Sequence, residues 1–488
     1  MGFKADVSFL EKLSMGASAT RSAIEYLRGL GFSPIELERY ATSNKIWSTK
    51  VKRLRLADLL CVRTGVRFEV RGKSVLQIRM SDSPTNPDRR WDAGLRDEDL
   101  IALVACAPAE EGIVCRTPVC FSVRDLRASV DLARLGPPKS ASEGAERDLT
   151  WPAIVPPEDG RVVEVTPEHV RVEFDSGRRQ TYRRNGKVCY LRAGDRFAGG
   201  AAFIAAAPAQ ILDPRSVLTR DWSPRAELGS ANATDRYAAA KALAVVPGHN
   251  VGETIQLLER ALVTEAEPRT ALEVAGALAK LGADTGFEYL DSAIRREDDA
   301  FLPYLRMEAV FILSEIRGDR AAASLDGVVR DAAFRDNELR QAAVWGLGRF
   351  GIEAYDRIVR HIADAEDDVA LHAIAGLGPN ASDAAIESCL RSLLESADRR
   401  EQAASSAALC RIGSPRVADR LVRASRETDS PWVPATLGRL PESALAGLDL
   451  GPELSQAIRP VAVLSEPNNW LAERGIATDF QFLLRQDL

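Results

Sequence analysis

Two acidic residues stand alone inside a strongly basic stretch, and their types and spacing suit phosphodiester chemistry. Asp58 and Glu69 are the only acids in residues 39–80, where eleven residues are Lys or Arg. Arg71 and Lys73 follow Glu69 at intervals of two, which puts alternate strand side chains on one side. Two carboxylates beside a cation can hold Mg²⁺ or Mn²⁺ and position an attacking water. These four residues are therefore candidate catalytic groups, with the two acids as metal ligands.

The elements around these residues predict how they are held. Residues 55–62 and 66–74 read as two strands joined by a turn at Arg63-Thr-Gly65, and pairing them brings Asp58 toward the side of Glu69. Upstream, Ala19–Leu30 has the apolar spacing of an amphipathic helix, and Gly31 is placed to end it. Downstream, Ile101–Ala105 reads as a buried strand.

This pattern resembles the restriction-endonuclease-like nucleases, whose signature is Pro-Asp followed after a gap by Asp/Glu-x-Lys. Asp58 takes the place of the first acid, Glu69 that of the second, and Arg71 that of the lysine. Ala57 replaces the proline, and Lys73 lies one strand step beyond the expected lysine. Arginine stays protonated and can stabilise a pentavalent phosphate, but it cannot replace lysine in tuning the water.

The resemblance implies an α/β domain over residues 1–135 that cleaves nucleic acid with Mg²⁺ or Mn²⁺. Glu36 or Glu38 would then supply a further upstream acid for the metal. Three readings stay open: an active nuclease, an inactive nuclease-like domain that binds nucleic acid, and a structural role. In the last of these, Glu69 simply neutralises a neighbouring arginine.

The excess of basic residues in this span predicts a polyanionic partner, and the phosphate backbone of DNA or RNA is the usual one. Aromatic rings lie among the cations, where a ring can stack on an unpaired base. A merely solvated basic face is the alternative. The candidate nucleic-acid-binding residues are Lys45, Trp47, Lys50, Lys52, Arg53, Arg55, Arg79, Arg89 and Arg90.

The middle of the chain contains two segments that differ in composition and periodicity from their neighbours. Residues 136–152 begin with a stretch rich in Gly, Pro and Ser and read as a solvated linker. Within residues 153–212, the stretch from Gly160 to Ala205 alternates with period two, and Asp175-Ser-Gly177 and Asn185-Gly186 supply hairpin turns. The segment Leu191–Gly200 resembles a turn of barrel and sandwich hybrid domains, which implies a small β-barrel.

The second half carries an internal repeat. Six alanine- and leucine-rich stretches end on a small residue and are each followed by a second amphipathic segment. Neither segment can bury its apolar stripe alone, so the units must stack into an elongated array. The pattern resembles HEAT repeats of the short variety also found in phycobilisome-lyase-like proteins. It implies an all-α solenoid over 230–445 that binds a protein partner, with residues 446–488 as a cap containing Trp470, Phe480 and Phe482.

Bulk composition fits this multidomain plan. The chain has 488 residues and a net charge of −6, too long for one core and too acidic overall for a generally nucleic-acid-coated protein. No apolar run suggests a membrane span, and seven scattered cysteines without a Cys-x-x-Cys pair fit a reducing compartment, so a cytoplasmic location is expected. The main hypothesis is a nucleic-acid-binding HEAT-repeat protein with a nuclease-like domain. The alternative is a non-catalytic HEAT-repeat scaffold for protein interactions.

Overall fold

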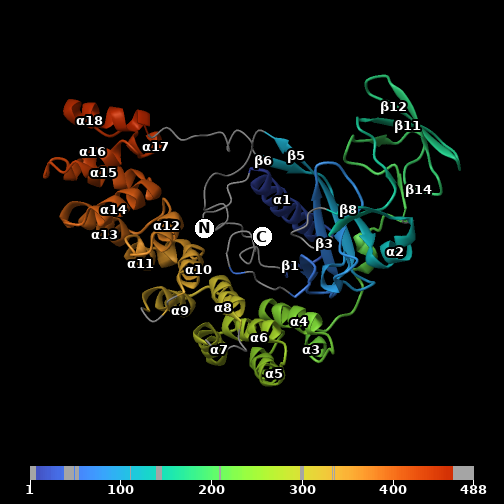
Figure 1. The fold of residues 1–488 in the computed structure, drawn as a ribbon, viewed down its shortest axis with the longest axis horizontal. Coiled ribbons are helices and arrows are strands. Elements are labelled where there is room, and N and C mark those ends of the chain that lie inside the picture. The colour runs from blue at the N-terminus through green and yellow to red at the C-terminus, as the bar shows by residue number, and fades with distance from the viewer. Residues whose placement is uncertain are drawn as a thin grey trace.

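A computed structural model gives the fold of the chain (Figure 1). Three regions follow one another along the sequence: a mixed sheet with a covering helix, a smaller all-β part, and a long stack of helices. The structure describes residues 7–37, 49, 54–109, 112–138, 146–207, 210–296, 302–331, 334 and 336–464.

The N-terminal region is built on a six-stranded mixed sheet. Its strand order is β1-β2-β3-β5-β6, and β7 also pairs with β5. The strands β3 and β5 run parallel, whereas the other neighbours are antiparallel. The helix α1 packs on the sheet through Ala19, Ala23, Ile24 and Leu27, which are buried. The bounds are α1 Val7–Gly29, β1 Pro34–Glu36, β2 Leu59–Cys61, β3 Arg67–Lys73, β5 Leu100–Ala109, β6 Gly112–Cys115 and β7 Val119–Ser122.

The sequence predicted the central hairpin of this sheet. The strands β2 and β3 pair antiparallel with Leu59 opposite Phe68, around the expected turn. Gly31 follows α1 with a φ of 92°, a conformation that glycine adopts without steric cost, so the predicted helix stop is confirmed.

A second, three-stranded sheet lies where the sequence predicted a linker. Its order is β4-β9-β8, with bounds β4 Arg79–Asp82, β8 Arg134–Pro138 and β9 Arg147–Thr150. Residues 136–152 are thus largely structured wherever the structure describes them. The long-range pairing of Met80 with Leu149 supplies the order that local composition does not indicate. Along the chain the short helix α2, Val123–Ala128, follows β7 and precedes β8.

The middle region consists of two small antiparallel sheets around one core. One sheet has the order β13-β12-β11-β15 and the other β10-β16-β14. Ile154, Val162, Phe174 and Phe197 are among the side chains that the two sheets bury together. The bounds are β10 Ala153–Ile154, β11 Gly160–Val165, β12 His169–Phe174, β13 Arg179–Arg183, β14 Val188–Cys189, β15 Arg196–Phe197 and β16 Ala205–Ala206.

One of the two predicted hairpin turns has a different role. The turn at 175–177 does join the paired strands β12 and β13. Asn185 and Gly186 have φ values of 46° and 77°, as a tight hairpin turn requires. However, β13 pairs with β12 and β14 pairs with β16, so this turn carries the chain from one sheet to the other.

The C-terminal half is a solenoid of paired helices, and the predicted repeat is confirmed. The first helices of successive pairs, α4, α6, α8, α10, α12, α14 and α16, each contact the next one. In Figure 1 α6, α8, α10 and α12 line the inner side of an arc, while α5, α7, α9 and α13 lie outside it. The first helices are α4 Ala233–Val245, α6 Pro268–Lys280, α8 Pro303–Glu315, α10 Asn337–Gly348, α12 Asp367–Gly376, α14 Arg399–Ile412 and α16 Trp432–Leu437.

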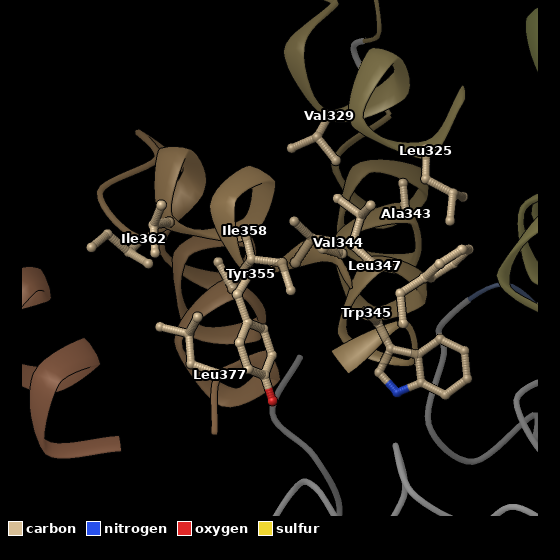
Figure 2. Close-up of a cluster of buried hydrophobic side chains, with 14 of the residues drawn as sticks. Leu325, Val329, Ala343, Val344, Trp345, Leu347, Tyr355, Ile358, Ile362 and Leu377 are labelled. Carbon is tan, nitrogen blue, oxygen red and sulfur yellow. The ribbon is translucent and has the colours of Figure 1, made fainter. Parts of the chain in front are cut away.

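The second helices complete each pair. They are α5 Val251–Thr264, α7 Asp284–Arg295, α9 Asp319–Arg330, α11 Tyr355–Ile358, α13 Asp383–Glu395, α15 Pro415–Ala424 and α17 Glu442–Leu445, and α3 Pro224–Glu227 precedes the stack. One hydrophobic core runs from Leu272 to Ile458 without interruption. Figure 2 shows part of it, where Leu325 and Val329 of α9 approach Val344 and Leu347 of α10.

The end of the stack is described only in part. The helix α18, Gly451–Leu464, packs against α16 within the predicted cap. Trp470, Phe480 and Phe482 lie outside the described residues. In the part of the chain that the structure describes, no helix is both long enough and apolar enough to cross a bilayer.

Candidate functional site

A buried ion pair joins the N-terminal sheet to the first repeat. Arg67 of β3 contacts Asp235 of α4, and the two side chains are only 2% and 8% exposed. The Arg67 backbone N–H donates to Asp99 Oδ1 at 3.1 Å, and Arg96 donates to the same carboxylate. Ser230 donates a hydrogen bond to Asp235 Oδ2. The pair is thus held from both sides, as a buried pair of charges requires.

Electrostatics favour the charged form of the acid in this pair. Burial alone opposes ionisation of Asp235. Attraction to Arg67 and hydrogen bonds from Asn232 and Arg67 outweigh that effect, so the pKa of Asp235 lies below its ordinary value. Burial is also the main reason that the pKa of Arg67 is lowered, but Asp99 and Asp235 oppose that shift.

Apolar contacts extend the same junction. Leu37, Leu56 and Leu60 of the N-terminal region form one buried cluster with Tyr237 and Ala238 of α4. Lys241, one helical turn beyond Ala238, donates from Nζ to the Leu37 carbonyl at 3.1 Å and lies 4.0 Å from Glu315 of α8. The N-terminal region is therefore docked on the solenoid through both apolar packing and charge.

A small polar cavity lies along this junction. It has a volume of about 270 Å³ and is enclosed by α1 and β1 on one side and by α4, α6 and α8 on the other. Charges of both signs line it, including Arg28, Lys280, Glu36 and Glu273. In Figure 1 α1 lies inside the arc of helices, so the cavity lies on the inner side of the solenoid.

The inner side of the solenoid differs between its two halves. In α6 every residue from Thr270 to Ala279 is buried, so this helix is covered on its inner side as well as by its neighbours. In α12, Leu371 is 61% exposed although Val369, Ala370 and Ala373 are buried. The helices α10, α11 and α14 contact α12, and in Figure 1 α12 lies on the inner side of the arc. We infer that its exposed face points inward. We call Leu371 with Ala403 and Ala407 of α14 the open inner surface.

The sheet brings the predicted catalytic acids toward one another, and each already contacts other protein groups. The Val70 backbone N–H donates to Asp58 Oδ2 at 2.6 Å, so Asp58 lies beside the strand that carries Glu69. Glu69 is buried and forms an ion pair with Arg71, the residue in the position of the motif lysine. Lys73 Nζ donates to the Arg79 carbonyl at 3.0 Å.

The predicted metal site is not assembled by the described residues. Glu36 pairs with Leu59 in the register of β1 and β2, on the strand next to the hairpin. Within the described ranges no three His, Cys, Asp or Glu side chains are grouped so that they could hold a metal ion. Glu38 lies outside those ranges.

Three of the candidate nucleic-acid-binding arginines lie near acidic side chains. Arg79 lies 3.9 Å from Asp148, and Arg89 lies 3.6 Å from Glu146. Arg90 lies 3.9 Å from Asp92. Arg55 is exposed. The other candidate nucleic-acid-binding residues, Lys45, Trp47, Lys50, Lys52 and Arg53, lie outside the described residues.

Sequence reasoning missed the residues of the domain junction. Asp235 and Lys241 are charged residues in an alanine-rich helix, for which the sequence predicted only a repeat unit. A charge on the otherwise apolar face of a repeat helix is a signal that something polar must meet it. That signal could have pointed to a partner for Asp235, but its identity as Arg67 could not be read from local sequence.

Comparisons with known proteins give only a distant likeness. No protein family profile matches the sequence, and no curated protein matches it. Solved structures of Kap121p, bound to Pho4p and bound to Nup53p, are similar to 50% of this chain, with 14% identity and a TM-score of 0.31. The matched region spans 30% of the length of those chains. The description of the C-terminal half as a helical solenoid rests on the order and packing of its own helices.

Proposed function

We propose that this protein is a scaffold that binds another protein on the open inner surface of its solenoid. The observation that carries the proposal is the exposure of Leu371, a large apolar side chain on the inner side of a packed helical stack. Exposed leucines are common singly, so exposure alone decides nothing. Its position on the inner side supports a binding role, because an array of repeats presents a continuous concave surface there.

The first half of the same solenoid supports this reading. There the inner sides of α4, α6 and α8 border the N-terminal region, which supplies Ile24 and Ile35 to the shared cavity. The repeats α12 and α14 continue the same architecture with small and apolar side chains, Leu371, Ala403 and Ala407, still accessible. We therefore expect the partner to present an apolar face that fits between these side chains.

Affinity capture with matched variants tests the proposal. The wild type is compared with Leu371→Asp and with Val263→Asp, a control at an 86% exposed aliphatic residue near the end of the outer helix α5. We expect one protein to be retained by the wild type and the control and to be lost with Leu371→Asp. It must then bind the purified wild type in isolation. Equal retention by all three chains, or failure of the purified pair to bind, would refute the proposal.

Nucleic-acid cleavage is a second candidate because one contact favours it. The Val70 backbone N–H donates to Asp58, and Val70 follows Glu69 on β3, which supports the closeness of two acids that the nuclease motif needs. The ion pair of Glu69 with Arg71 counts against it, since it occupies a carboxylate that would face the metal. Incubation with labelled DNA and RNA plus Mg²⁺ or Mn²⁺ decides the matter. Cleavage by the wild type that is lost in Glu69→Gln would support the enzyme, and no cleavage would exclude it.

A further inference from the structure

Two cysteines of the N-terminal sheet face each other across neighbouring strands. Cys106 of β5 and Cys115 of β6 are direct register partners, and their Sγ atoms lie 3.2 Å apart. Directly opposed residues of an antiparallel pair have Cα atoms about 4.5–5.5 Å apart, inside the range of about 4.4–6.8 Å that disulfides span. Both thiols are reduced in the structure. The backbone is therefore already placed for a bond of about 2.0 Å between the two sulfurs.

The two thiols differ in access. Cys106 is 3% exposed and sits in the core beneath α1, whereas Cys115 is half-buried at the edge of that core. The hydrogen bond from Cys106 lowers the pKa of Cys115, and the same hydrogen bond together with burial raises the pKa of Cys106. Since the thiolate is the reactive form, Cys115 is the thiol that a small oxidant meets first.

We propose that Cys106 and Cys115 form a peroxide-sensitive thiol pair that closes to a disulfide across β5 and β6. The Cys115 thiolate attacks hydrogen peroxide, forming an S–O bond as the O–O bond breaks, and the leaving hydroxide takes a proton to become water. The Cys106 sulfur then attacks the sulfenic sulfur of Cys115. The S–S bond forms, the S–O bond breaks, and the leaving hydroxide takes the Cys106 proton as a second water. Two thiols lose two electrons and one peroxide gains them.

The bond would tie together two elements that support α1. Ile113 and Cys115 of β6 pack against the cluster that contains Ala23 and Leu27 of α1. The same helix reaches the junction with the solenoid through Ile24 and Arg28. Oxidation would therefore restrict β6, the edge strand of the sheet on which α1 rests.

Peptide mapping of the full-length chain tests the pair directly. Residues 97–116 contain no Lys or Arg before Arg116, so trypsin leaves both cysteines in one peptide. After peroxide treatment and alkylation of free thiols, that peptide should carry no alkyl group and weigh less by two hydrogens. Glu110 and Glu111 separate the cysteines, so a glutamate-specific protease should leave two fragments joined only by the disulfide.

Variants separate this chemistry from general oxidation. We expect the disulfide to be unchanged in Cys189→Ser, a control at another half-buried cysteine, and to be absent in Cys115→Ser. In Cys106→Ala, Cys115 should stop at the sulfenic acid and be trapped by dimedone. Dithiothreitol should restore both thiols in the wild type. Continued alkylation of both cysteines after peroxide, or oxidation of Cys115 to the sulfinic acid without a disulfide in the wild type, would overturn the proposal.

Discussion

Arg67 and Asp235 form a buried ion pair although 168 residues separate them in the sequence. Arg67 belongs to the central sheet of the N-terminal region and Asp235 to the first helix of the solenoid. Removing one partner of a buried pair leaves an uncompensated charge, which costs more than the pair itself contributes. The junction between the two regions therefore depends on this contact.

Replacing Asp235 should destabilise the whole chain. For Asp235→Asn we expect the free energy of unfolding to fall by about 3–5 kcal/mol, because Arg67 stays buried and loses the carboxylate that its guanidinium contacts. The control is Asp284→Asn, which removes an exposed ion pair with Arg320 and should cost at most about 1 kcal/mol. Urea denaturation followed by circular dichroism measures both. Equal losses in the two variants would contradict the assigned role of the pair.

The same pair predicts acid sensitivity. The pKa of Asp235 is lowered in the folded state, so the acid contributes stability that is present above its unfolded pKa, about 3.9, and is lost as pH falls through the folded value. The asparagine side chain of the Asp235→Asn variant does not titrate. We therefore expect the stability gap between wild type and variant to be constant near neutral pH and to shrink below about pH 4. A gap that widens in acid would show that another group controls the junction.

Two glycines of the outer helices test the packing of the repeats. A Cβ at Gly286 of α7 would lie 2.3 Å from the Ala279 backbone nitrogen and 2.5 Å from the Ala275 carbonyl oxygen of α6, whereas one at Gly327 of α9 would meet nothing within 4 Å. Gly286→Ala should thus destabilise by about 1–3 kcal/mol. Gly327→Ala should stabilise by about 0.5–1 kcal/mol through helix propensity. Thermal unfolding of both variants is the measurement, and a stabilised Gly286→Ala would disprove the close approach of α6 and α7.

Local patterns in the sequence were enough to predict the elements, and non-local contacts decided the rest. The helix stop at Gly31, the β2–β3 hairpin and the repeat units follow from periodicity and stop signals within short windows. The partner of Arg67 lies far along the chain, so a residue counted toward a basic surface is instead buried. The sequence also predicted the turn at Asn185-Gly186. The strands before and after this turn belong to different sheets, because local turn chemistry does not specify which strands pair.

In the candidate site too, local patterns predict some features and non-local contacts decide the others. Hairpin geometry predicted from alternation does bring Asp58 beside the strand of Glu69. Arg79 and Arg89 lie near Asp148 and Glu146, and both acids belong to the segment that the sequence predicted as a linker. The open inner surface could not be predicted either, because local sequence does not tell whether a distant region covers a repeat helix such as α6 or α12.

The binding strength of the captured partner tests the central claim most directly. Isothermal titration calorimetry with the purified partner should give a dissociation constant at least about tenfold higher for Leu371→Asp than for the wild type, a loss of about 1.4 kcal/mol or more. Val263→Asp should bind like the wild type, since its side chain lies on the outer helix α5. Unchanged affinity for Leu371→Asp, with the fold intact by circular dichroism, would contradict binding on the open inner surface.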